Sequence, residues 1–95
     1  MASLHIEHAV TEFSTWTAAF ASFAEARRSA GVRSEHIRRP VDDPAYVVVD
    51  LEFDTVEEAQ GFLGFLTEAV WAVPENSPGL SGRPEAKVLE TVVLT

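Results

Sequence analysis

The stretch Tyr46-Val-Val-Val-Asp-Leu-Glu-Phe53 decides the fold of this chain. Alternate side chains of an extended strand point to opposite faces, so the stretch has one wholly apolar face and one mixed face. The apolar face carries Val47, Val49, Leu51 and Phe53. The mixed face carries Tyr46, Val48, Asp50 and Glu52. Its β-branched content indicates a strand, and its continuous apolar face predicts a central place in a sheet.

The residues before this strand predict a strand, a helix and a second, shorter strand. Residues 4–10 alternate, and Thr11 is a plausible N-cap for the helix that follows. Apolar residues then recur at helical spacing up to Gly31, which is suited to end the helix. The weaker, charged pattern of residues 32–39 is typical of an edge strand. Residues 41–44 (Val-Asp-Asp-Pro) predict the turn of a hairpin.

The residues after the central strand predict a second helix and a last strand. Thr55 and Glu58 fit a capping box, and an apolar stripe continues to Val70. Pro and Gly mark residues 74–85 as an irregular connection, and the last strand is expected at Val88–Leu94. The order βαββαβ predicts a ferredoxin-like α+β fold with a four-stranded antiparallel sheet, in one domain spanning residues 1–95.

Composition excludes several functional classes. The chain has 95 residues, seven of them basic and fifteen acidic, which gives a net charge of −8. Such a chain is repelled by phosphate backbones and anionic membranes, so we expect neither nucleic acid nor a membrane as partner. It has no cysteine and no apolar run approaching the roughly 20 residues that span a bilayer. We therefore expect an acidic cytoplasmic protein.

The mixed face of the sheet predicts self-association. Helices cover one face of such a sheet, and apolar groups on the other face need another partner. Val48 lies on that second face, and so do Leu89 and Val93 of the expected last strand. We expect a homodimer whose sheets face each other and enclose a cavity, although side chains alone could fill that space.

Short motifs occur along nearly the whole chain: His8-Ala9-Val10-Thr11-Glu12-Phe13, Trp16 with Phe20, Arg28 with Gly31, Arg39, Asp42-Asp43-Pro44, Val47-Val48-Val49, Ala59 with Phe62, and Pro84-Glu85. With these motifs the chain resembles small actinobacterial-type proteins of the dimeric α+β barrel superfamily, which are similar to antibiotic biosynthesis monooxygenase domains. The resemblance implies a homodimer with helices outside and a pocket in each subunit. Its members include cofactor-free oxygenases of aromatic polyketides, haem-degrading enzymes, lactone isomerases and proteins with no known activity.

The histidines bear on metals and cofactors. His5 and His8 are three residues apart on one predicted strand, so they point to opposite faces and cannot share a metal ion. Haem-degrading relatives carry an axial histidine on the second helix, whereas His5, His8 and His36 all fall on predicted strands. We therefore expect neither a metal site nor a bound cofactor.

His8 is the candidate catalytic residue. It shares the apolar face of the first strand, where burial would shift its pKa and make it a general base toward a phenolic or enolic substrate. The alternative is a hydrogen-bonded core histidine.

The candidate ligand-binding residues come from three elements. Trp16 belongs to the first helical stripe, where it either packs in the core or lines a pocket. Tyr46 and Asp50 share the mixed face of the central strand and could orient a polar ligand there. Either His36 or Arg39 faces inward, depending on the hairpin register.

Two functions are compatible with these residues. The first is a small-molecule-binding homodimer that acts as a cofactor-free monooxygenase or cyclase of an aromatic or polyketide-like compound. The second is a non-catalytic binding or assembly protein whose dimer is the functional unit. Fold alone does not choose between them.

Overall fold

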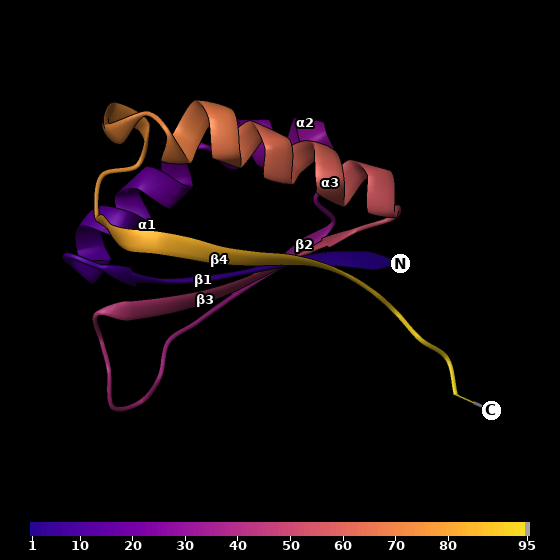
Figure 1. Cartoon of the computed structure of the whole chain (residues 1–95), viewed down its shortest axis with the longest axis horizontal. Helices are drawn as coiled ribbons and strands as arrows, with labels where there is room; N and C mark the ends of the chain where they lie inside the picture. The colour runs from indigo at the N-terminus through magenta and orange to yellow at the C-terminus, as the bar shows by residue number, and fades with distance from the viewer. Residues whose placement is uncertain (95) are drawn as a thin grey trace.

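A computed structural model, which describes residues 1–94, shows a four-stranded antiparallel sheet in the order β2-β3-β1-β4. The strands are β1 (Ala2–Val10), β2 (Ser34–Arg38), β3 (Tyr46–Phe53) and β4 (Leu80–Glu90). The helices α1 (Phe13–Ser22), α2 (Ala24–Ala30) and α3 (Val56–Phe65) all lie on one side of the sheet (Figure 1). The predicted ferredoxin-like α+β class is confirmed.

The central position of β3 is also confirmed. It pairs with β1 and β2, placing Leu51 opposite Leu4 and Val47 opposite His8. Its apolar face meets the helices and forms the core, where Val47, Leu51 and Phe53 are almost inaccessible to solvent. The other face of the sheet carries no helix (Figure 1). The two faces predicted from the sequence therefore become a covered face and an open face.

The first helix differs from its prediction in two respects. Its N-cap is Glu12 rather than Thr11, and no side chain caps its backbone. The helix is also broken at Phe23, which has non-helical φ and ψ of −102° and 15° and separates α1 from α2. No glycine or proline signals this break, and the Phe23 ring there packs edge to face against Phe65 of α3, with centroids 6.2 Å apart. Gly31 ends α2 with φ of 102°, as its conformational freedom predicts.

The second helix begins as predicted. The Thr55 side chain accepts from the Glu58 backbone, and the Glu58 side chain accepts from the Thr55 backbone, so the capping box is complete. After Phe65 the chain continues through a π-helical turn, Leu66–Trp71, and a short 3₁₀ turn, Pro74–Asn76. Within the described chain, no helix is long and apolar enough to cross a membrane.

The last strand was predicted in the wrong place. Residues 80–85 are not an irregular connection, because β4 begins at Leu80 and ends at Glu90. Gly82, with φ of 74°, and Pro84 are tolerated because β4 is an edge strand that bulges between the partners of Glu7 and Ala9. Residues 91–94 leave the sheet and project past the open face (Figure 1). Val92 and Val93 therefore lie outside the strand, and only Leu89 occupies its predicted open-face position.

The hairpin of β2 and β3 follows its prediction. Residues 41–44 turn the chain, and the Asp43 carboxylate accepts from the Ala45 backbone N–H at 3.1 Å. β2 is an edge strand. His36 pairs with Asp50, so its side chain is on the open face. The register left open by the sequence is thereby settled.

Candidate functional site

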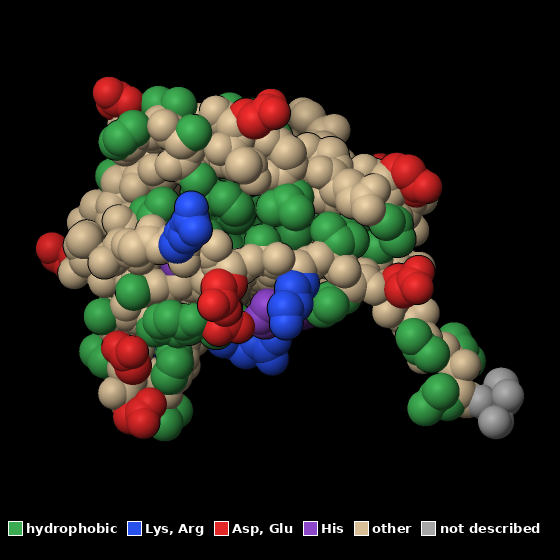
Figure 2. Space-filling view, viewed as in Figure 1, with side chains coloured by type: hydrophobic (Ala, Val, Ile, Leu, Met, Phe, Trp, Pro, Cys, Tyr) green, Lys and Arg blue, Asp and Glu red, His purple; other side chains and the backbone are tan. Residues whose placement is uncertain are grey.

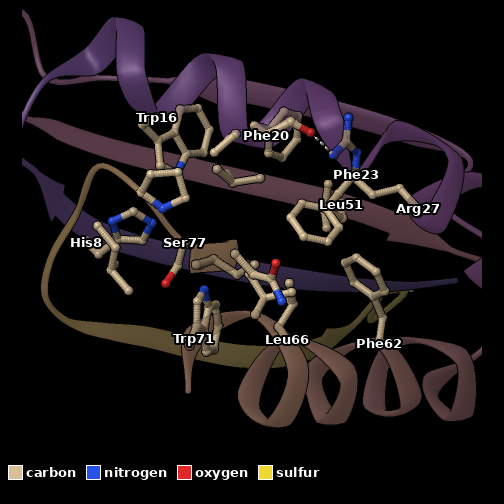
Figure 3. A pocket seen from close by; sticks show the side chains of 17 residues that line it. His8, Trp16, Phe20, Phe23, Arg27, Leu51, Phe62, Leu66, Trp71 and Ser77 are labelled. Carbon is tan, nitrogen blue, oxygen red and sulfur yellow. Dashed lines mark hydrogen bonds between the residues drawn. The ribbon is translucent and has the colours of Figure 1, made fainter. Parts of the chain in front are cut away.

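A cavity of about 70 Å³ lies between the covered face of the sheet and the helices (Figure 3). One end is apolar and aromatic, with Phe20, Phe23, Phe62 and Leu66. The other end carries the polar groups, with His8, Trp16, Trp71 and Ser77 (Figure 3). Its apolar lining with a few polar groups at one end has the composition of a small-molecule site, although its volume is below the roughly 300–1,000 Å³ of typical ligand pockets.

His8 enters this cavity from β1 with only 4% of its surface exposed. Its Nδ1 lies 2.8 Å from the Ala9 carbonyl oxygen, which can only accept, so Nδ1 carries the proton. The lone pair is therefore on Nε2. Burial lowers the pKa of His8 below its ordinary value, more than the bond to Ala9 raises it. His8 is thus a neutral imidazole at pH 7, with the tautomer that a general base requires.

A bulge in β4 lies directly opposite His8. Glu7 pairs with Glu85 and Ala9 pairs with Ser81, so residues 82–84 of β4 face the single residue His8. The glycine and proline within this segment are the sequence features that permit a bulge. The glycine and proline that permit the bulge were therefore visible in the sequence. They predicted a loop there, because the sequence does not show the pairing of this segment with β1.

Trp16 forms one wall of the cavity from α1. Its indole stacks on Phe20 at 5.0 Å and 25°, and its centroid is 6.2 Å from that of His8 at 64°. Gly79 packs against the Trp16 backbone, and a Cβ on Gly79 would lie 2.9 Å from the Trp16 nitrogen. The close approach fixes the start of α1 against the strand that carries the bulge.

Trp71 and Ser77 are pocket residues that the sequence did not identify as such. Trp71 comes from the π-helical turn after α3, and its side chain lies beside that of Ser77 (Figure 3). The Ser77 hydroxyl donates to the Val73 carbonyl at 3.2 Å. The predicted helical stripe ended at Val70, directly before Trp71, because the π-helical turn that redirects Trp71 has no signature in the sequence.

Arg27 closes the apolar end. It is 5% exposed, and its guanidinium lies 3.6 Å from the Phe20 ring centroid. Nε donates to Glu35 at 2.6 Å, and Nη1 donates to the Phe20 carbonyl. These contacts tie α2 to β2 and α1, and Glu35 balances the Arg27 charge. Arg27 therefore lines the cavity with a side chain that is held by bonds within the protein.

The structure separates the six predicted site residues. His8 and Trp16 meet in the cavity. Arg39 lies over the Phe13 ring at 4.6 Å and does not line the cavity. Tyr46, Asp50 and His36 are on the open face of the sheet. Sequence reasoning placed His8 and Tyr46 on different strand faces but could not show that a cavity lies beneath the helices on the face of His8.

The open face carries a continuous polar network. His5 Nδ1 lies 2.7 Å from Asp50, and His5 Nε2 lies 2.9 Å from Glu7. Tyr46 donates to Glu7 at 2.7 Å, and Arg38 donates to Asp50 at 2.7 Å. His5 and His8 thus point to opposite faces of β1, as their odd spacing predicts.

The network changes the pKa of several of its members. Hydrogen bonds from His5 and Tyr46 lower the pKa of Glu7. The bond to Glu7 raises the pKa of Tyr46 to about 12. Burial raises the pKa of Asp50, but bonds from His5 and Arg38 outweigh it and leave that pKa lowered. Both carboxylates are therefore ionised at neutral pH.

Several solved structures share the fold of this chain. The chain is similar to the "Putative antibiotic biosynthesis monooxygenase" of Bordetella bronchiseptica, with a TM-score of 0.69 and 14% identity over 97% of both chains. A second antibiotic biosynthesis monooxygenase has a TM-score of 0.69 and 10% identity, covering 98% of this chain and 100% of the other. A dimeric ferredoxin-like protein from an uncultured marine organism has a TM-score of 0.64 and 12% identity, covering 100% and 98%.

Sequence comparison adds no closer relationship. No protein-family model matches the chain. No curated protein matches its sequence either. The chain therefore shares its ferredoxin-like fold with these proteins, as the order of its strands and helices predicted.

Proposed function

We propose that the cavity binds a small aromatic molecule with an acidic hydroxyl group, and that His8 removes its proton. The observation that carries this proposal is the neutral His8 at the polar end of an apolar chamber. The nitrogen free to accept a proton is set by the bond to Ala9, so no rearrangement precedes proton transfer. Trp16 and Phe20 offer a flat wall for an aromatic ring.

The chemistry that follows deprotonation is cofactor-free monooxygenation. A phenolate is electron-rich and can reduce molecular oxygen: one oxygen atom becomes a carbonyl on the ring and the other leaves as water, so that a phenol plus O₂ gives a quinone plus water. The protein contributes a base, an orienting wall and a largely apolar chamber. The two similar monooxygenases support this reaction class. Cyclisation through the same anion is the related alternative.

The test uses a variant that separates the base from the fold. His8→Asn keeps a side-chain donor near the Nδ1 position for the Ala9 carbonyl but has no basic nitrogen. Calorimetric titration with phenol and 1-naphthol measures binding, and an oxygen electrode measures O₂ consumption. We expect the variant to bind within a few-fold of the parent and to lose O₂ consumption by roughly 10²–10⁴-fold. If the parent protein binds neither phenol nor 1-naphthol, the cavity is not such a site.

We also propose that the chain is a homodimer joined through its open sheet faces. Val48 and Leu89 place apolar surface on a face that no helix covers. The similarity to a dimeric ferredoxin-like protein supports this assembly. Light scattering at micromolar concentration should give twice the chain mass, and Val48→Asp should lower it. A chain mass for the parent would contradict the dimer.

A non-catalytic assembly protein is the second candidate function, favoured by the extent of the open-face network. In that case His8→Asn changes stability only, and the parent consumes no O₂ with any phenol. An acidic, cysteine-free chain with net charge −8 fits a cytoplasmic protein under either function, and it disfavours nucleic acids and anionic membranes as partners.

A further inference from the structure

Five side chains from three strands form one hydrogen-bonded chain across the open face. Arg38 of β2 contacts Asp50 of β3, Asp50 contacts His5 of β1, and His5 contacts Glu7, which accepts from Tyr46. Figure 2 shows histidine and basic side chains gathered under the sheet, between the hairpin and the C-terminal segment. This hydrogen-bonded network occupies the surface through which the homodimer is proposed to form.

His5 can donate a hydrogen bond to both Asp50 and Glu7 only when its imidazole is protonated. A carboxylate is an acceptor, so each carboxylate contact requires a proton on the imidazole nitrogen that faces it. His5 faces Asp50 with one ring nitrogen and Glu7 with the other, at 2.7 Å and 2.9 Å. A neutral imidazole has one N–H and leaves one carboxylate without its donor. The geometry therefore describes imidazolium.

The other charged groups around His5 do not replace this proton. In β4, Lys87 lies opposite His5 and Glu85 opposite Glu7. In β3, Glu52 accepts from Ser3, and Asp50 is held on its far side by Arg38. In β2, His36 lies opposite Asp50. Loss of the His5 proton thus removes one positive charge from a face that carries four carboxylates, Glu7, Asp50, Glu52 and Glu85.

We propose that the open face is a proton-linked contact surface for a second copy of this chain, which associates while His5 is charged and separates when His5 loses its proton. This inference rests on the proposed dimer. A two-fold interface doubles the effect, because each copy brings one His5.

The energetic reason is desolvation. His5 and Asp50 have side chains 26% and 17% exposed in the single chain, and a facing sheet would remove most of that contact with water. Burying paired charges carries a desolvation cost, but burying a carboxylate that has lost its donor costs more. Bonds to Glu7 and then Asp50 already raise the pKa of His5, although burial of the imidazole by itself lowers it. Loss of water from both ionised carboxylates in the dimer would make the protonated imidazole, which donates to both of them, still more favourable.

The sign of the effect follows from this pKa. The proton is bound more tightly in the dimer than in the separated chain, so association is strongest at low pH and weakens as pH rises through the raised pKa of His5. Each unit of pKa difference contributes a tenfold change per His5, or about a hundredfold per dimer.

Sedimentation equilibrium of the full chain from pH 6 to pH 9, at constant ionic strength, tests the proposal. We expect the dimer dissociation constant to rise at least tenfold across this range. His5→Gln should remove the pH dependence, because glutamine cannot gain a proton. His36→Gln is the matched control on the same face, and it should keep the pH dependence of the parent.

Each outcome is decisive. A parent dimer with the same dissociation constant at every pH overturns the proton linkage and leaves the dimer intact. The same pH dependence in His5→Gln assigns the linkage to another group and also overturns it. A parent monomer at every pH overturns the dimer itself. Imidazole nitrogen chemical shifts of His5 in the parent give a check that needs no variant, because they report one titration with a pKa above the ordinary histidine value if the proposal holds.

Discussion

The His8 imidazole and the Trp16 indole meet edge to face, with centroids 6.2 Å apart and planes inclined at 64°. One comes from the first strand and the other from the first helix, separated by a single turn of chain. Their contact joins a neutral base to an aromatic wall at the same end of the cavity. This pair is the structural basis for the proposed function.

Burial of His8 predicts a stability that falls with acid below neutral pH. Unfolded His8 titrates near its ordinary pKa of about 6.5 and binds a proton that the folded residue resists. The unfolded state therefore gains protons first as the pH drops, and the free energy of unfolding decreases. Urea unfolding at pH 7.0 and 5.5 should show a larger loss for the parent than for His8→Asn. An equal loss in both proteins would assign the acid sensitivity to other groups.

Gly79 predicts a large response to a single methyl group. Gly79 has φ of 88°, and a Cβ there would lie 2.9 Å from the Trp16 backbone nitrogen. Gly79→Ala should destabilise the protein by about 2–4 kcal/mol, from left-handed backbone strain plus overpacking. Gly61→Ala is the matched control in α3, where a Cβ meets nothing within 4 Å. It should stabilise by about 1 kcal/mol. Denaturant midpoints measure both, and a mild effect at Gly79 would mean that the loop can move away from Trp16.

Truncation of Arg27 is predicted to lower the free energy of unfolding, and this loss should be coupled to Glu35. Arg27→Met removes the donor to the Phe20 carbonyl and the partner of Glu35, and we expect a cost of about 1–3 kcal/mol. Glu35 retains access to water, so the loss should stay below that of a fully buried pair. A double-mutant cycle with Glu35→Gln should give a coupling energy clearly above zero. The exposed pair Arg28 and Glu25, treated in the same way, should couple by less than about 0.5 kcal/mol.

Tyr46 predicts a spectroscopic signature of the open-face network. It is the single tyrosine of the chain, so absorbance at high pH reports its ionisation alone. The bond to Glu7 raises its pKa to about 12. Glu7→Gln removes the carboxylate and should return the midpoint toward the ordinary value of about 10. Circular dichroism at each pH confirms that the sheet is intact. A parent midpoint near the ordinary value would show that Tyr46 does not bond to Glu7.

Local patterns predicted the elements well where their cause is local. The alternation in residues 46–53, the capping box of Thr55 and Glu58, and Gly31 at a helix end all depend on neighbours within a few residues. The break at Phe23 and the start of β4 at Leu80 have no such cause. The first depends on packing over the sheet. The second depends on an edge strand that accepts glycine and proline because only one side of it is paired.

For the candidate site, too, the sequence predicted the features with a local cause and missed those with a long-range cause. Strand periodicity alone separated His5 from His8 and put His8 on the apolar face, since a two-residue period fixes the side of every residue. It also grouped Tyr46 with Asp50. It did not indicate that Trp71 and Ser77 would join His8, because they are brought there by a π-helical turn and a long-range approach to β1.

The sequence by itself determined the order of strands and helices, the two faces of the sheet and the placement of His8 on the apolar face. Periodicity and capping are properties of short segments, and they survive without knowledge of the rest of the chain. Only the tertiary structure decided which nitrogen of His8 is free, which groups share its cavity, and how His5 is held between two carboxylates. Those features depend on hydrogen bonds and packing between residues as far apart as His5 and Asp50, which no local pattern encodes.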